Sequence, residues 1–266
     1  VDDYRQDHLQ LHYARQLSQT VTLNAALHYT RGEGYYEEYD EDAAYANYGF
    51  DPVVLNSDTL FATDLVRRKW LDNHFYGITF SMIHHQPAKR TITIGGALHQ
   101  YLGDHFGTII WMANAGDIEK GDRWYEGDGV KNDGNLYIKL LQHLSGKLSV
   151  YGDLQYRHVM HDINGTDNNL RDITGRHTFH FFNPKAGLVW QQNRSQRSYL
   201  SLAIANREPN RQNFTDADPL QPLPKPDRLD NLEVGHKSTI HNLAMSVNIL
   251  GMYYDSQLVM TGEIDD

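Results

Sequence analysis

The chain has 266 residues, of which 40% are hydrophobic and 11% aromatic, and it contains no cysteine. Its formal net charge is −10 with histidine neutral, and the absence of a basic stripe argues against a nucleic-acid partner. The lack of cysteine excludes a disulfide framework, a thiolate nucleophile and a cysteine-type zinc site. No apolar run approaches the roughly 18 residues of a membrane-spanning helix, but strands of a membrane barrel alternate and therefore average out to polar.

The first strong pattern is a pair of alternating segments near the start of the chain. Residues 5–15 and 21–30 alternate apolar with polar side chains on either side of a short turn at 17–20. Leu9 and Leu11, for example, share one face of the first segment. Each segment has about ten residues, which is the length that crosses a bilayer at a tilt. The sequence therefore predicts a hairpin of two long strands.

Four further hairpins of the same kind follow along the chain. They lie at 76–98, 134–158, 181–206 and 232–255, with tight turns near 84–88, 145–146, 191–196 and 238–241. Long connections at 31–69, 103–132, 164–175 and 207–229 separate them. Soluble sandwiches have mixed turns and shorter strands, whereas tight turns at one end and long loops at the other are typical of outer-membrane barrels. We therefore predict an all-β fold, an antiparallel transmembrane β-barrel formed as an up-and-down meander, with about ten strands of a larger barrel.

The segment 199–206 shows most clearly what each face of this sheet meets. Leu200, Leu202 and Ile204 lie on one face, whereas Ser201 and Ala203 lie on the other. A strand with one apolar side and one side of small or polar groups fits a wall between lipid and water. We therefore expect the apolar face to contact lipid and the polar face to line a water-filled lumen.

Several segments resemble a known family. They are Leu23–Gly32, Tyr151–His158, Asn183–Trp190, Tyr199–Arg211, Asn231–Gly235 and Tyr253–Ile264. These segments resemble the C-terminal barrel region of TonB-dependent outer-membrane receptors, of the siderophore-receptor-like type found in Bacteroidetes-like bacteria. The resemblance implies a barrel of about 22 strands closed by an N-terminal plug. It also implies import of iron chelates or similar scarce ligands with energy passed from TonB.

On this resemblance, residues 1–266 are expected to be a partial barrel domain that lacks the plug and the barrel-closing strands. The short turns would face the periplasm and the long loops the outside of a Gram-negative cell. The expected partners are the outer-membrane bilayer, an iron chelate or similar small ligand, and TonB through the missing plug. The fragment, with two open sheet edges, would self-associate. It would be neither an enzyme nor dependent on a cofactor, and siderophore, haem, cobalamin and glycan all remain open as ligands.

The segment Arg207–Arg211 leaves a predicted strand at the outer rim, where two guanidinium groups could face a polyanionic chelate. The alternative, which we favour, is that Arg207 pairs with Glu208 or with carboxylates of the lumen or plug and fixes the loop. Aromatic loop residues could stack on a ligand, pack the loops together or form the interfacial belt. The complete set of candidate ligand-binding residues is Arg207, Arg211, Tyr35, Tyr36, Tyr39, Trp111, Trp124 and Tyr125.

The chain has 15 histidines, but their spacing does not predict a metal site. His158 and His161 are separated by an odd number of residues, so they would point to opposite faces of a strand, as would His177 and His180. The acidic segments 37–42 and 162–172 lack the calcium-loop pattern, and no Gly-x-Ser-x-Gly nucleophile motif is present. A soluble β-sheet module that binds carbohydrate through its loop aromatics is the second interpretation, and a barrel hydrolase is the third.

Overall fold

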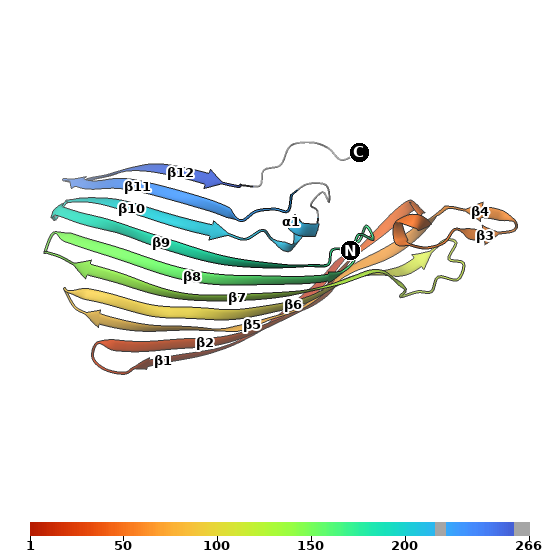
Figure 1. Cartoon of the computed structure of the whole chain (residues 1–266), viewed down its shortest axis with the longest axis horizontal. Coiled ribbons are helices and arrows are strands. Elements are labelled where there is room, and N and C mark those ends of the chain that lie inside the picture. The colour runs from red at the N-terminus through yellow and green to blue at the C-terminus, as the bar shows by residue number, and fades with distance from the viewer. Residues whose placement is uncertain (216–221, 258–266) are drawn as a thin grey trace.

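The computed structural model describes residues 1–215 and 222–257, which form one long, curved antiparallel sheet (Figure 1). Its ten strands pair in the order in which they occur along the chain. They are β1 (Asp2–Gln16), β2 (Val21–Ala44), β5 (Ala62–Gln86), β6 (Arg90–Met112), β7 (Arg123–His143), β8 (Leu148–Gly165), β9 (Gly175–Asn193), β10 (Gln196–Arg207), β11 (Asp227–Ile240) and β12 (Leu243–Asp255). The predicted antiparallel meander of about ten strands is confirmed.

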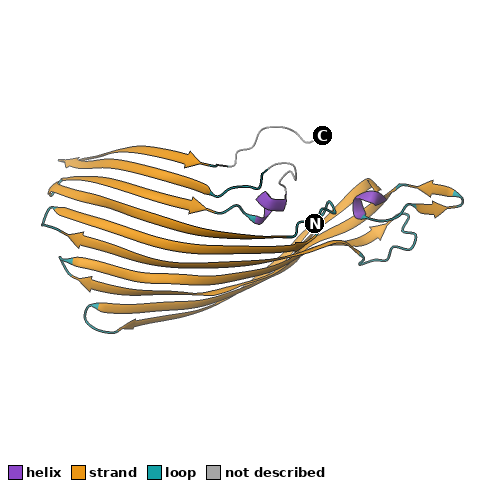
Figure 2. Cartoon of the chain, viewed as in Figure 1, coloured by secondary structure: helices purple, strands orange, loops and turns teal. Residues whose placement is uncertain are grey.

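The short turns all lie at one end of the sheet, on the left of Figure 1, and the long connections lie at the other end. Within residues 1–215 and 222–257 the helical content is small: a 3-10 helix, η1 (Tyr45–Tyr48), and one short helix, α1 (Arg211–Thr215), both visible in Figure 2. No helix among the described residues is long and apolar enough to span a membrane. The predicted segments 216–221 of the last long connection and 258–264 of the family motif lie outside the described residues.

Two of the predicted long loops are largely strand. β2 continues to Ala44 and β5 begins at Ala62, so most of 31–69 is paired, and β6 and β7 likewise extend into 103–132. The pairing continues because ion pairs replace aliphatic contacts across the strands: Arg67 binds Glu38, and Arg68 binds Glu37 at 2.7 Å between Nε and Oε2. Alternation of apolar residues, the signal used to predict strands, is absent where charged pairs stabilise the ladder.

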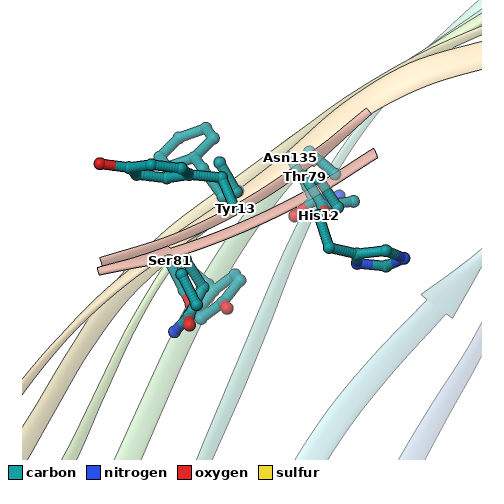
Figure 3. Close-up of a pocket in the computed structure, with 13 residues that line it drawn as sticks. His12, Tyr13, Thr79, Ser81 and Asn135 are labelled. Atoms are coloured by element: carbon teal, nitrogen blue, oxygen red, sulfur yellow. The ribbon is translucent and has the colours of Figure 1, made fainter. Parts of the chain in front are cut away.

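The two faces of the sheet differ as predicted. On the outer face, Leu98, Leu202 and Ile138 keep 62%, 53% and 45% of their surface exposed, and no second sheet or helix among the described residues covers them. Figure 3 shows the alternation directly, because Tyr13 and His12 are neighbours in the chain but point to opposite sides of the strands. The apolar outer residues form a band across the strands, for example at 92–98 on β6 and 134–140 on β7, which pair with each other, and Gln100 and Gln142 lie just outside it.

Beyond this band, the ends of β2, β5, β6 and β7 form an arm with a small hydrophobic core of its own. The core consists of Ala43, Tyr45, Tyr48, Leu65, Ile109, Met112 and Trp124. The hairpin of β3 (Val53–Leu55) and β4 (Asp58–Leu60) lies at the tip of the arm, at the far right of Figure 1. Gly49 ends η1 with a φ of 70°, a conformation that glycine adopts without strain. The described part of the chain therefore contains a thin membrane wall and a separately packed loop region.

We expect a lysine in place of Ile138 to destabilise the protein, because this side chain lies in the middle of the apolar band. The cost of lysine near the bilayer midplane is about 2–4 kcal/mol of the free energy of unfolding. The measurement is equilibrium unfolding in guanidinium from phospholipid vesicles. Leu55→Lys, at the half-exposed tip of the β3–β4 hairpin, is the control and is expected to change little. Equal effects at the two positions would show that Ile138 does not face lipid.

Candidate functional site

Charged side chains gather on the inner face of the sheet just above the apolar band. Lys131 and Asp133 lie on β7, Arg157 and His161 on β8, and Glu208 follows the end of β10. We call these five residues the inner-rim cluster. Their alternation in β7 and β8 directs all four strand residues to the face opposite Ile138 and Leu154.

Glu208 is the centre of the inner-rim cluster. Its Oε1 accepts a hydrogen bond from Lys131 Nζ at 2.7 Å and one from Arg157 Nη2 at 3.0 Å, and its Oε2 accepts from Arg157 Nη1 at 2.8 Å. Arg157 also donates to both carboxylate oxygens of Asp133, with Nη2–Oδ2 at 2.5 Å. Two cations and two carboxylates thus cancel, and Glu208 is only 8% exposed.

The segment that carries Glu208 folds back over the inner face of β7, β8 and β9. Phe214 of α1 stacks on His177 of β9, with ring centroids 3.9 Å apart and planes 8° apart. Arg211 lies against Gly129, since its Cδ and Nε atoms are 4.0 Å from the position that a Cβ would take at this glycine. His161 pairs with His177 in the strand register and is 5% exposed, and its Nε2 atom has no hydrogen-bond partner in the structure.

The pKa values of His161 and Glu208 are both lowered, but for different reasons. Burial lowers the pKa of His161 to about 4, with a further contribution from the positive charge of Lys131. Burial would raise the pKa of Glu208, but the hydrogen bond and charge of Lys131, with Arg157, outweigh it and leave this pKa below its ordinary value. Near neutral pH the inner-rim cluster therefore contains an ionised Glu208 beside a neutral His161.

The two predicted arginines belong to different environments. Arg207 is largely exposed at the rim and donates from Nη2 to Asp227 Oδ2 at 2.5 Å, so it joins the end of β10 to the start of β11. The loop-fixing alternative named Glu208 or carboxylates of the lumen or plug as partners, and in the structure the partner is Asp227, on the inner face at the start of β11. Arg211 lies instead over the inner face, where its charge acts on His105 and Tyr125. A ligand-binding role for either arginine stays a prediction.

The six predicted aromatic residues separate between the two faces of the sheet. Tyr36 and Tyr125 lie in one inner-face row, because both share the register line through Lys69 and Gly107. Trp124 covers Gly107 and is buried in the core of the arm.

The other three predicted aromatic residues, Tyr35, Tyr39 and Trp111, lie on the outer face. Tyr35 packs against Trp70, with ring centroids 4.7 Å apart, and Arg68 lies 3.9 Å above the Tyr35 ring. Tyr39 and Trp111 flank Val66, and Tyr39 donates a hydrogen bond to Asp64. These six residues therefore do not form one binding surface, and whether any of them contacts a ligand stays a prediction.

Sequence reasoning missed the inner-rim cluster. Lys131, Asp133 and Arg157 occupy inward positions of strands, and a search for charged residues at such positions would have found them. Glu208 was considered only as a partner of Arg207. Its contacts with Lys131 and Arg157 span 77 and 51 residues of sequence, and no local pattern predicts them.

The histidine pairs lie as the spacing predicted, on opposite faces, but neighbouring strands bring other histidines together. His158 and His180 face each other on the outer face, with ring centroids 4.8 Å apart, and His161 faces His177 on the inner face. Among residues 1–215 and 222–257, no group of three or more His, Asp or Glu side chains has the arrangement of a metal site. A hollow of about 500 Å³ on the sheet is lined by residues of β1, β2, β5, β6 and β7 (Figure 3). His12, Asn24, Ser81 and Asn135 are among these residues, and no two of these four side chains form an ion pair.

Comparison with known proteins identifies the family. A family model described as "TonB dependent receptor-like, beta-barrel" matches residues 1–263. No curated protein sequence matches the chain. Among solved structures, the chain is similar to the ferric-catecholate import receptor Fiu of E. coli K12 in its closed form, with a TM-score of 0.65 and 12% identity over 94% of this chain and 41% of that one.

Two further solved structures show the same fold. The copper transporter OprC has a TM-score of 0.70 and 12% identity, over 94% of this chain and 39% of that one. The ferric yersiniabactin uptake receptor FyuA from Yersinia pestis has a TM-score of 0.62 and 11% identity, over 94% of this chain and 36% of that one. The chain thus spans about two fifths of the length of the structures that it matches.

The strand topology and the family model together define the class of protein: a wall of an antiparallel β-barrel of the receptor type. The chain belongs to the TonB-dependent receptor β-barrel family, whose members are outer-membrane proteins of Gram-negative bacteria. The resemblance inferred from sequence is confirmed. At identities of 10–12%, the similar structures support the fold, and they do not identify the ligand.

Burial of His161 predicts a loss of stability on mild acidification. An unfolded chain binds a proton at this imidazole near pH ~6.5, whereas the folded protein does so only at about 4, so stability falls as the pH drops through this window. The full effect is about 3 kcal/mol. Glu208 lowers the stability only at a more acidic pH. Its stabilising charge is fully present above its unfolded pKa of ~4.3 and is lost as the pH falls through its lower folded pKa.

The measurement is the melting temperature of the protein in detergent at about pH 7 and about pH 5, a range that lies above the pKa of Glu208 in both states. His105 also has a pKa lowered to about 4, so the comparison rests on the difference between the variant and the wild type. His161→Gln is expected to reduce the drop by several degrees. His143→Gln, an exposed position next to a short turn, is the control. An unchanged drop in the His161 variant would show that this imidazole titrates alike in the folded and unfolded protein.

Proposed function

We propose that this chain forms part of an outer-membrane receptor that imports a scarce anionic ligand, most specifically an iron–siderophore complex. In this proposal the chain supplies barrel wall, lumen lining and extracellular loops. The rest of the receptor supplies the plug, and through the plug the contact with TonB. The membership in the TonB-dependent receptor family supports transport as the general role.

The observation that carries the ligand class is the inner-rim cluster. Lys131 and Arg157 lie on the lumen face where a ligand enters from the loop end of the barrel, and they already hold the carboxylate of Glu208. Arginine and lysine in such positions bind carboxylate and catecholate oxygens through charge-assisted hydrogen bonds. Solved receptors of similar fold include a ferric-catecholate import receptor and a ferric yersiniabactin uptake receptor, and these names support an iron chelate as the cargo.

Tyr36, Tyr125 and Arg211 are the predicted residues that fit this proposal best, since they share the inner face with the inner-rim cluster. Arg207, Tyr35, Tyr39, Trp111 and Trp124 would act through loop structure or through contacts at the outer surface.

The alternative function, carbohydrate binding by a soluble β-sheet module, requires a sheet whose apolar residues are covered. No observation favours this alternative, because the apolar strand residues are exposed as in a membrane wall.

The test of this function is growth restoration by the full-length gene. A Gram-negative strain without siderophore synthesis and without its own ferric-chelate receptors receives the gene and is grown on single iron sources. We expect growth on a ferric chelate and loss of that growth when the plug is deleted or TonB is absent. Failure to grow on every ferric catecholate, hydroxamate and carboxylate supplied, with the protein present in the outer membrane, would overturn iron chelates as the cargo.

A further inference from the structure

The carboxylate of Glu208 is held in the way that a receptor would hold an anionic ligand. It accepts three hydrogen bonds of 2.7–3.0 Å from Lys131 and Arg157, two of them from the forked guanidinium group. Planar, two-point contacts of this kind are the usual mode of carboxylate recognition by arginine. Both cations come from the barrel wall, whereas Glu208 comes from a connection between strands.

The connection that carries Glu208 is anchored at its base by the residues just before Glu208. Asn206 N and Nδ2 both donate to Asn183 Oδ1, at 3.0 and 2.8 Å. These hydrogen bonds hold the C-terminal end of β10 against β9. Arg207 then binds Asp227, the first residue of β11, and closes the base of the loop. The segment 208–215 begins directly after these anchors, so it can leave the inner face without disturbing the pairing of β10 with β9 or β11.

A buried imidazole nitrogen without a hydrogen-bond partner among the described residues lies under this segment. His161 lies beneath it, near Lys131, Arg157, Glu208 and His177, and its buried Nε2 has no hydrogen-bond partner in the structure. A buried polar atom without a partner is a cost of the closed arrangement, and movement of the segment would give this atom access to water or to a ligand. The ion pairs of Glu208 and the stack of Phe214 on His177 are among the contacts that hold the segment on the inner face.

We propose that Glu208 is an internal substitute for the ligand: it occupies the cation site of Lys131 and Arg157 in the empty receptor, and an incoming polyanionic ligand displaces it. This inference deepens the proposed function and rests on it. The exchange replaces one set of ion pairs with another, so neither cation is left buried and unpaired. Asp133 stays on β7 and keeps Arg157 oriented throughout.

The substrate class follows from the exchange. A chelate with several anionic oxygens, such as a ferric tris-catecholate, can take over the hydrogen bonds that Glu208 makes. A neutral chelate, such as a ferric tris-hydroxamate, cannot compensate the two cations and gains nothing by displacing the carboxylate. Binding of an anionic ligand would therefore release the segment 208–215 from the inner face.

The test is a comparison of two variants that remove the same charge. Glu208→Gln removes the internal carboxylate and keeps its shape. Glu37→Gln is the matched control, because Glu37 is partly buried, binds one arginine (Arg68) at 2.7 Å, and lies on the outer face. Binding of a ferric tris-catecholate and of a ferric tris-hydroxamate is measured by tryptophan-fluorescence quenching on the full-length protein in detergent.

We expect Glu208→Gln to bind the catecholate about 10- to 100-fold more tightly, because the site is no longer occupied by its own carboxylate. Hydroxamate binding and the Glu37→Gln protein should match the wild type. Lys131→Gln is expected to weaken catecholate binding. Unchanged or weaker catecholate binding by Glu208→Gln, in a protein that folds, would show that Glu208 has a structural role only and would overturn the inference.

A second measurement needs no ligand. Hydrogen exchange of the segment 208–215 should be faster in Glu208→Gln and in Phe214→Ala than in the wild type, and unchanged in Glu37→Gln. Phe214→Ala keeps every charge of the inner-rim cluster and so tests the loop if the glutamine variant does not fold. Equal exchange in all proteins would overturn the inference.

The two measurements also separate the inference from the proposed function. If exchange rises but neither wild type nor any variant binds a ferric chelate, iron transport fails as the function, and inorganic pyrophosphate serves as the polyanionic probe. Tighter binding of pyrophosphate by Glu208→Gln would then support displacement, and unchanged binding would overturn it. If the wild type binds the catecholate but Glu208→Gln does not bind it more tightly, the function stands and the displacement fails.

Discussion

Backbone hydrogen bonding in lipid is the constraint on which this structure depends. A strand that crosses a bilayer must pair each of its N–H and C=O groups with other strands, because lipid offers no alternative partner. The continuous antiparallel ladder from β1 to β12 satisfies this requirement for the inner strands of the described sheet. It also fixes the direction of every side chain, since residues alternate between lipid and lumen. The positions of Ile138 in the apolar band and of Lys131 in the lumen follow from the same ladder.

The wall continues well beyond the apolar band, and different interactions stabilise this part. In β2 and β5, ion pairs such as Arg67–Glu38 and Arg68–Glu37 bridge the strands where water is available to the charges. Individually such partly exposed pairs contribute little, so the small core around Trp124 and Leu65 is needed to hold the arm together. The arm therefore has a local hydrophobic core, whereas the membrane wall has lipid in place of one.

The sequence predicted the strands where aliphatic residues alternate and missed them where charged residues do. The hairpins around Leu98 and Leu202 were recognised because their apolar residues repeat with a period of two. The extensions to Ala44 and Met112 were assigned to loops, because Tyr, Glu and Arg there gave no hydrophobic period. The candidate site was harder to predict from the sequence than the strands were. Alternation places Tyr35 and Tyr36 on opposite faces and Lys131 and Arg157 on the inner face. No sequence pattern predicts that Glu208 contacts Lys131 and Arg157.

If the ligand is an anion, as proposed, the charge balance of the inner-rim cluster bears on how an acidic protein would admit it. The chain carries a net charge of −10, so free carboxylates at the lumen entrance would repel an anionic ligand. Unpaired cations in the same place would be unfavourable, because both side chains are partly buried and would lack a counter-charge. Glu208 resolves both problems at once. Its negative charge neutralises Lys131 and Arg157. In the proposed exchange, its place on a connection, not on a strand, lets it give way to a stronger anion. A carboxylate fixed in the wall, like Asp133, orients the guanidinium group but cannot make that exchange.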